Sequence, residues 1–260
     1  MYGLGYSLKQ YFKFSRKEMN EIFWTSLAFA FILTFRKWGS GKNVDLASGL
    51  TNLGLALLFV LIAMFAHVSL QKVVAIRLGY IATYSFWLNG LLLCVLLTFL
   101  SVGYIVFILP GAVMLQHTPL IRLGKYRFGP NLKDIARVGL AGSMSHVVLI
   151  MVIGLFYFYG GHNEWLFAFI IINLFLAVYS LLPVPKIDLP TKMDAGSDGL
   201  SMFFFSRTMF VLVFSTIFVY SILVYIAANS YATLGGLFIV AFIIGCILSI
   251  AYSISVEQKN

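Results

Sequence analysis

Charged residues are scarce in this chain of 260 residues: only 10% are Asp, Glu, Lys or Arg, and only nine are acidic. The chain is instead 61% hydrophobic, with a mean hydropathy of +0.95. Such a composition is far more apolar than that of a water-soluble domain. We therefore predict an integral membrane protein that forms a single membrane domain over residues 1–260.

Cysteine is almost absent as well. Cys94 and Cys246 each lie alone inside an apolar run, without CxxC or CxxH spacing, so the sequence supports neither a disulfide framework nor a cysteine zinc site. The N-terminal segment 1–21 is polar and basic and has no signal-peptide cleavage pattern, so we expect the first apolar run to be a retained anchor. The net charge of +9 comes from short segments between apolar runs and does not indicate nucleic-acid binding.

Long apolar runs dominate what is present. Judged against the roughly 20 residues that a spanning helix needs, the candidates are 22–35, 49–71, 86–109, 136–159, 164–182, 202–228 and 232–255. The connections 160–164 and 229–231 are short, which makes the helices that they join antiparallel neighbours.

The distribution of basic residues predicts which connections are cytoplasmic. Lys and Arg crowd the connection 110–136 and the N-terminal segment, and Lys72 and Arg77 follow the second run, so both termini are predicted to be cytoplasmic. Run 86–109 then has both ends on the cytoplasmic side. We therefore predict about six transmembrane helices and a re-entrant segment that is helical at first and β-like through Gly103 and Pro110. Only the external connection 36–48, with Arg36 and Lys37, runs against this pattern.

Polar residues at membrane depth are costly, and each indicates a functional site until a packing role is found. His67 and Gln71 are one helical turn apart and share a face. The small-residue run 139–145 allows close helix packing and leads into His146. Pro183 and Pro185 end a later helix ahead of Asp188. The topology puts all three groups at a similar depth.

These three motifs, in this order, resemble the site-2 protease family of intramembrane zinc metalloproteases. The resemblance is to its archaeal-type members above all, and it covers about residues 49–210. The family's HExxH is represented by His67-Val68-Ser69-Leu70-Gln71, and its GxxxN by Gly142 to His146. Its NxxPxxxLDG is represented by Ser180 to Leu189, with Pro183 retained. The resemblance implies a site-2-protease-like core at 49–210, preceded by a basic segment and first helix at 1–48 and followed by C-terminal helices at 211–260.

The resemblance leaves two positions for the third metal ligand of the family. Spacing from Pro183 favours Asp188, whereas the Asp-Gly pair at 198–199 favours Asp198.

The departures from the motifs lie at the catalytic positions. Val68 stands where the family has its glutamate base, and valine cannot accept a proton. Gln71 stands where the family has its second histidine, and the amide of Gln71 is a poor zinc donor. No catalytic residue is intact on this reading, and zinc is not expected. The resemblance then implies an inactive pseudoprotease that contacts lipids and binds or regulates another transmembrane protein.

Three alternatives stay open. The first is an active or metal-binding protease with a rebuilt site made of His67, His146 and either Asp188 or Asp198. The second is a transporter or channel whose pathway is lined by the re-entrant segment. The third is a structural subunit of a membrane complex.

Overall fold

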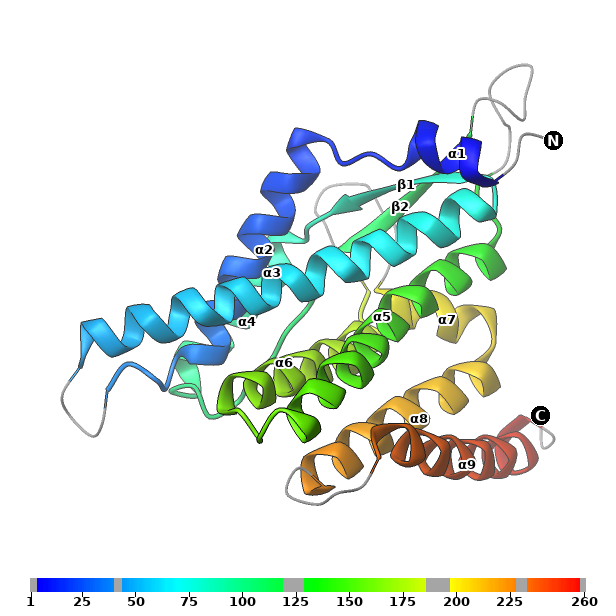
Figure 1. Cartoon of the computed structure of the whole chain (residues 1–260). Coiled ribbons are helices and arrows are strands. Elements are labelled where there is room, and N and C mark those ends of the chain that lie inside the picture. Colours follow the sequence, from blue (N-terminus) through cyan, green and yellow to red (C-terminus); the bar gives the residue numbers. More distant parts are fainter. Residues whose placement is uncertain (1–3, 40–43, 119–128, 186–196, 228–232, 258–260) are drawn as a thin grey trace.

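The computed structural model describes residues 4–39, 44–118, 129–185, 197–227 and 233–257, which are mostly helical (Figure 1). The helices are α1 (Leu4–Tyr11), α2 (Arg16–Thr34), α3 (Leu46–Arg77), α4 (Leu88–Leu100), α5 (Leu132–Tyr159), α6 (Glu164–Ser180), α7 (Asp198–Phe205), α8 (Arg207–Ile226) and α9 (Leu234–Tyr252). A π-helical turn, Ser253–Glu257, continues α9. Strands β1 (Tyr80–Ser85) and β2 (Ala112–His117) form the two-stranded sheet.

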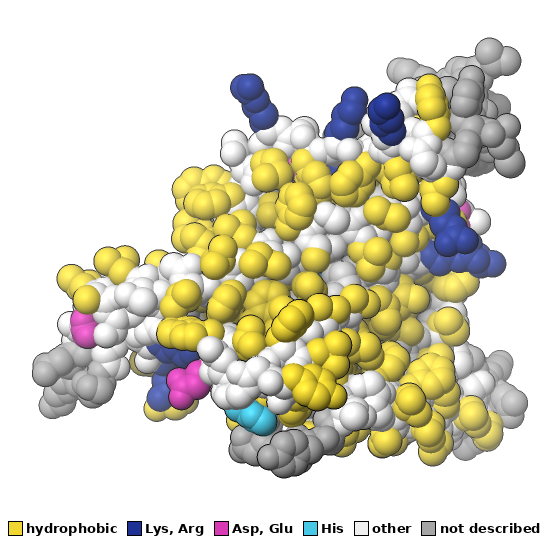
Figure 2. Space-filling model, in the orientation of Figure 1, with side chains coloured by type: hydrophobic (Ala, Val, Ile, Leu, Met, Phe, Trp, Pro, Cys, Tyr) yellow, Lys and Arg dark blue, Asp and Glu magenta, His cyan; other side chains and the backbone are white. Residues whose placement is uncertain are grey.

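Four of the described helices, α3, α5, α8 and α9, are long and apolar enough to cross a membrane. The helices α4 and α6 are also apolar but shorter, with 13 and 17 residues. Hydrophobic side chains cover most of the face in Figure 2, and the Lys and Arg side chains lie at its edges. This distribution is that of a membrane-embedded helical protein, as the composition predicts.

Polar caps fix where most of the helices begin. Each cap side chain accepts a hydrogen bond from a backbone N–H in the first turn, where the helix itself offers no acceptor. The caps are Ser15, Asp45, Asn131, Asn163, Ser197, Ser206 and Thr233. Ser206 also shifts the start of one predicted span, because the apolar run 202–228 is divided there into α7 and the long apolar helix α8.

The segment between α3 and α5 leaves one end of the molecule and returns to it. The strands β1 and β2 pair antiparallel, from Tyr80 opposite His117 to Ser85 opposite Ala112. Between them, α4 continues away from the sheet, and the chain turns at Gly103, whose φ of +72° suits glycine. Residues 104–111, which lead from this turn to β2, are called the return segment below. At 13 residues, α4 is about 20 Å long and too short to span a bilayer alone. A segment that is helical at first and extended on its return was predicted for 86–109, but strand β1 was not.

Helix α3, strand β1 and helix α2 are joined by a buried ion pair. Lys72 Nζ donates to Glu18 Oε1 at 2.7 Å and also to the carbonyl oxygens of Lys13 and Ala82. Glu18 Oε1 in turn accepts from the N–H of Tyr84 at 2.9 Å. Both charged side chains are almost fully buried, with 3% and 6% exposed. Side chains of distant segments therefore satisfy the outer edge of β1, which would otherwise carry unpaired groups.

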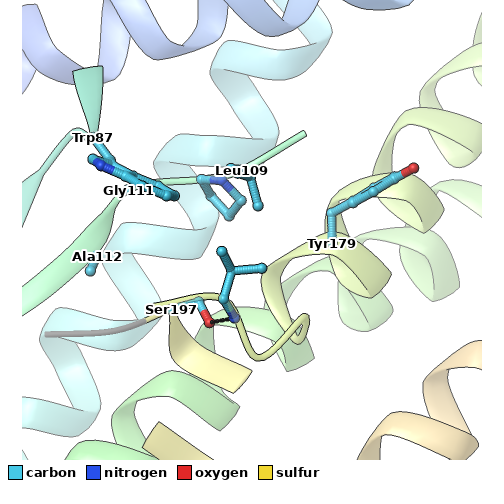
Figure 3. A pocket seen from close by; sticks show the side chains of 8 residues that line it. Trp87, Leu109, Gly111, Ala112, Tyr179 and Ser197 are labelled. Atoms are coloured by element: carbon cyan, nitrogen blue, oxygen red, sulfur yellow. Dashed lines mark hydrogen bonds between the residues drawn. The ribbon is translucent and has the colours of Figure 1, made fainter. Parts of the chain in front are cut away.

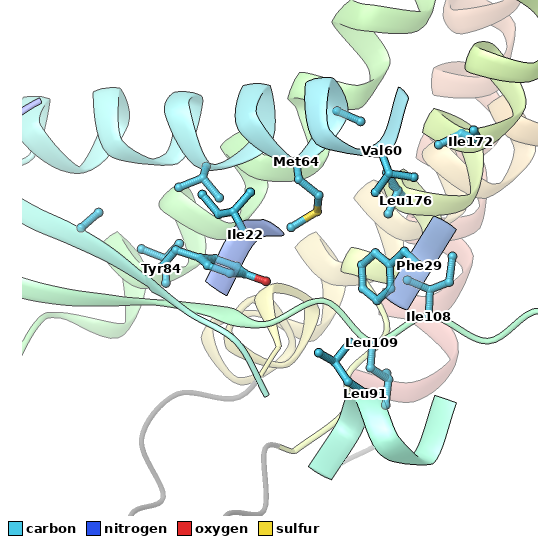
Figure 4. Close-up of a cluster of buried hydrophobic side chains, with 14 of the residues drawn as sticks. Ile22, Phe29, Val60, Met64, Tyr84, Leu91, Ile108, Leu109, Ile172 and Leu176 are labelled. Atoms are coloured by element: carbon cyan, nitrogen blue, oxygen red, sulfur yellow. The ribbon is translucent and has the colours of Figure 1, made fainter. Parts of the chain in front are cut away.

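The apolar core beneath this pair binds α2, α3 and the return segment together. Figure 4 shows Ile22 and Phe29 of α2 facing Val60 and Met64 of α3, with Ile108 beside them. A second buried cluster joins α5, α6, α8 and α9, and includes Ile150, Ile217 and Tyr220. Close to the junction of these halves, α3 and α5 run side by side and carry the polar residues that the sequence singles out.

Candidate functional site

His67 is the centre of a buried polar cluster between α3, α5 and α7. Its Nδ1 lies 3.1 Å from Nε2 of His146 on α5, and its Nε2 lies 3.2 Å from Oδ2 of Asp198 at the start of α7. Gln71, one turn further along α3, donates from Nε2 to the same Asp198 oxygen at 2.8 Å. The helical spacing of His67 and Gln71 thus brings both side chains to one carboxylate, as their shared face predicts.

Asn173 of α6 completes the cluster on its other side. Its Nδ2 donates to the carbonyl oxygen of Phe169, so its Oδ1 is the atom that faces Nδ1 of His146, at 3.0 Å. An amide oxygen can only accept, so Nδ1 of His146 carries a hydrogen and donates it. When His146 is neutral, its Nε2 then accepts the hydrogen of His67 Nδ1.

The last contact of the cluster lies between His67 and Asp198. With Nδ1 of His67 donating to His146, Nε2 of His67 faces Oδ2 of Asp198 at 3.2 Å, which also accepts from Gln71. Contacts between polar atoms therefore join Asn173, His146, His67 and Asp198 in one row.

Glycines on α5 make the cluster compact. A Cβ on Gly142 would lie 2.5 Å from Cε1 of His67 and 2.6 Å from Nε2 of Gln71. A Cβ on Gly139 would lie 3.0 Å from Cβ of Asp198. The small-residue run 139–145 therefore allows α3 and α7 to approach α5 closely, as predicted. Ser143 of the same run shares a hydrogen bond with Ser180 of α6, with 2.8 Å between the two hydroxyl oxygens.

Asp198 reaches the cluster because the chain folds back after α6. Helix α6 ends at Ser180, and Pro183 follows in an exposed position, as the proline pattern predicts. The N–H of Val184 donates to Oγ of Ser197 at 3.0 Å, which ties the start of α7 to the end of α6 (Figure 3). The cavity beside this tie, between Leu109, Gly111 and Tyr179, has a volume of only about 10 Å³. It holds one water at most.

The cluster is enclosed by the protein. His67, Gln71, His146 and Asn173 are at most 3% exposed, and Asp198 is 9% exposed. Val68, the neighbour of His67, is fully buried in the apolar core with Met64. The Val68 side chain therefore packs in the core, and it carries no group that could accept a proton from a water molecule.

The structure describes only one of the two candidate carboxylates, Asp198. Asp198 contacts His67 and Gln71 directly, whereas Asp188 lies outside the described residues. The sequence reasoning overlooked Asn173, although an asparagine in the middle of the apolar run 164–182 is itself a polar residue at membrane depth. The alternative of a rebuilt site groups His67 with His146, and the structure places these two side chains in direct contact.

The donors do not fit a catalytic zinc ion in this arrangement. Zinc binds one nitrogen of each imidazole and takes three protein ligands at a catalytic site. Here His67 directs one nitrogen at His146 and the other at Asp198, and Gln71 turns an N–H toward Asp198. The amide oxygen of Gln71 has no hydrogen-bond partner among the described residues, but an amide is a poor zinc donor. Within the described ranges, no group of three or more His, Cys, Asp or Glu side chains is placed to hold a metal ion.

Comparisons of the chain with protein-family models, with curated proteins and with solved structures found no match.

Proposed function

We propose that this protein is a catalytically inactive relative of the intramembrane site-2 proteases, with about six spanning helices and both termini in the cytoplasm. It acts by binding or regulating another membrane protein. The observation that carries the proposal is the use of both ring nitrogens of His67 by protein side chains, next to a buried Val68. Peptide hydrolysis at a metal needs an open ligand position and a base, and this cluster offers neither.

The surroundings of the cluster support a retained scaffold. Gly139 and Gly142 still allow the close helix packing that a shared site between α3, α5 and α7 requires. The polar groups that a hydrolytic site would turn toward a substrate instead bond to one another. Polar contacts between buried side chains of α3, α5, α6 and α7 hold these helices together, which suits a binding scaffold. Within the described residues, Oε1 of Gln71 has no hydrogen-bond partner.

An apolar groove between α6 and α8 is where we propose that the partner binds. A cavity of about 350 Å³ opens there, lined by Phe175 and Val178 of α6 and by Phe218 and Ile222 of α8. Phe218 and Ile222 are 46% and 43% exposed. Such a surface suits the apolar side of one transmembrane helix of another protein, held by packing between helices.

The test of inactivity is a cleavage assay. The purified chain, reconstituted in lipid vesicles with zinc, is incubated with peptides that contain a transmembrane segment. We expect no cleavage above that of a His67→Ala variant. Cleavage that a chelator stops and that His67→Ala abolishes would overturn the proposal.

The test of partner binding is photo-crosslinking in native membranes. A crosslinker at Ile222 in the groove is expected to capture a transmembrane protein, and a Val178→Trp change that fills the groove is expected to abolish that adduct. A crosslinker at Ile247 of α9, which is 61% exposed, serves as the control. Equal capture at both positions would contradict a specific groove.

The transporter alternative gains no support from the site. A transport pathway needs polar groups that water can reach in series, whereas the five polar side chains of the cluster are at most 9% exposed.

A further inference from the structure

A second cavity lies at the end of the molecule where α2 ends and α3 and α6 begin. It has a volume of about 580 Å³ and is lined by all three helices and by Val106 of the return segment. Among the α3 residues that line it, Phe59 lies furthest from the start of the helix. Phe59 is still eight residues from His67, or about 12 Å along the helix. The cavity is therefore separate from the polar cluster, and the inference below does not rest on the proposed function.

The cavity lining changes from polar to apolar along α3. Asn52 lies at the mouth with Lys37 and Glu164, whereas Leu55 and Phe59 lie one and two turns deeper. From Asn52 to Phe59 the helix rises about 10 Å. A site that is charged at its mouth and apolar inside matches an amphiphile whose headgroup stays near water and whose chain enters the membrane.

The two charges at the mouth have no partner in the part of the chain that the structure describes. Arg36, beside Lys37, lies 3.9 Å above the ring of Tyr104, but neither Lys37 nor Glu164 forms an ion pair with a described residue. Asn52 Nδ2 donates to the carbonyl oxygen of Lys37 at 3.0 Å, which holds this backbone at the mouth.

We infer that this cavity binds one phospholipid whose headgroup carries a phosphate and a primary ammonium, as phosphatidylethanolamine does. Lys37 contacts the phosphate, Glu164 accepts from the ammonium, and one acyl chain lies against Leu55 and Phe59. Charge-assisted hydrogen bonds of this kind need N–H donors, which a choline headgroup lacks. A transmembrane helix fits less well, because a helix about 10 Å across fills about 800 Å³ over 10 Å of its length. It would also leave both charges without a partner.

Native mass spectrometry of the full chain, purified in detergent, tests the inference. The protein is incubated with phosphatidylethanolamine, phosphatidylcholine or phosphatidylglycerol of the same acyl chains. We expect one phosphatidylethanolamine to be retained per chain and the other two lipids to be retained less. Lys37→Ala and Glu164→Ala should each lower its retention about tenfold, the size expected for one lost charge-assisted contact.

Matched variants separate binding in the cavity from general lipid contact. Leu55→Trp fills the cavity and should abolish retention, whereas Leu58→Trp, on the same helix but 52% exposed, should not. Lys133→Ala at the start of α5 controls for loss of an exposed charge. If Leu55→Trp does not fold, the two exposed charge variants decide the result. Equal retention of the three lipids, preferred retention of phosphatidylglycerol, or charge variants that retain lipid like Lys133→Ala would overturn the inference.

Discussion

His67 and His146 meet ring to ring, with Nδ1 of the first 3.1 Å from Nε2 of the second. The contact occupies Nε2 of His146, which could otherwise bind a ligand. The remaining ring nitrogen of His67, Nε2, faces Asp198. Two histidines and a carboxylate are thus close together but arranged in a line. A line of hydrogen bonds holds helices together, whereas a metal site needs its donors to converge on one point.

Adding a methyl group to Gly142 should disturb the cluster. In Gly142→Ala the new Cβ would lie within 2.6 Å of His67 and Gln71, so these side chains must leave their positions in the cluster or helices α3 and α5 must move apart. We expect a loss of about 1 to 3 kcal/mol in unfolding free energy, as for other overpacked positions. Thermal unfolding in detergent measures it. Gly54→Ala on α3 is the control, because nothing lies within 4 Å of its Cβ, and an unchanged or raised melting temperature is expected there.

Gln71 and Asp198 should be energetically coupled. Asp198→Leu leaves the N–H groups of Gln71 and a nitrogen of His67 without a partner, so it should destabilise the protein more than Gln71→Leu does. A double-mutant cycle should give a coupling of about 1 to 3 kcal/mol. Strict additivity of the two changes would show that the hydrogen bond contributes nothing.

Removing Lys72 should be costly because its partner Glu18 is buried. Lys72→Met leaves Glu18 charged and buried, and breaking such a pair from one side costs about 3 to 5 kcal/mol. The control is Lys17→Met, whose pair with Glu21 spans 3.8 Å and whose side chain is 86% exposed. That variant should stay within about 0.5 kcal/mol of the wild type. Chemical unfolding of the three proteins compares them, and equal losses would contradict the role of burial.

Glu18 should make stability depend on pH on the acid side. Burial by itself raises the pKa of the Glu18 carboxyl, but the hydrogen bonds from Lys72 and from the N–H groups of Ser15 and Tyr84 hold that pKa below its usual value of 4.5. The stabilisation is therefore present above 4.5, and it is lost as the pH falls through the lowered pKa of the folded state. Melting temperatures measured from neutral to acid pH should fall less steeply for Glu18→Gln. Parallel curves for both proteins would refute the assignment.

Local patterns predict part of the site and miss what depends on the fold. The i, i+4 spacing places His67 and Gln71 on one face, and the small residues of α5 predict a close helix contact, which Gly142 provides. Counting along the chain could not decide between Asp188 and Asp198, because Asp198 is positioned by the bond between Ser197 and Val184, thirteen residues apart. Spacing does not encode such a return of the chain.

The unpredicted strand β1 has a similar explanation. The sequence predicts an apolar run over 49–71, whereas α3 continues to Arg77 and the chain then turns at Gly79, with a φ of +89°. The outer edge of β1 is then stabilised by Lys72 and Glu18, neither of which belongs to a neighbouring strand. Strand propensity alone does not reveal that a buried ion pair can take the place of a third strand.

Zinc binding tests the central claim most directly, namely that both ring nitrogens of His67 are occupied by protein side chains. The purified wild-type protein and a His67→Ala variant are equilibrated with zinc, washed, and analysed for metal by mass spectrometry. The account predicts substoichiometric zinc that is the same in both proteins. One zinc ion per wild-type chain, lost in His67→Ala, would contradict it.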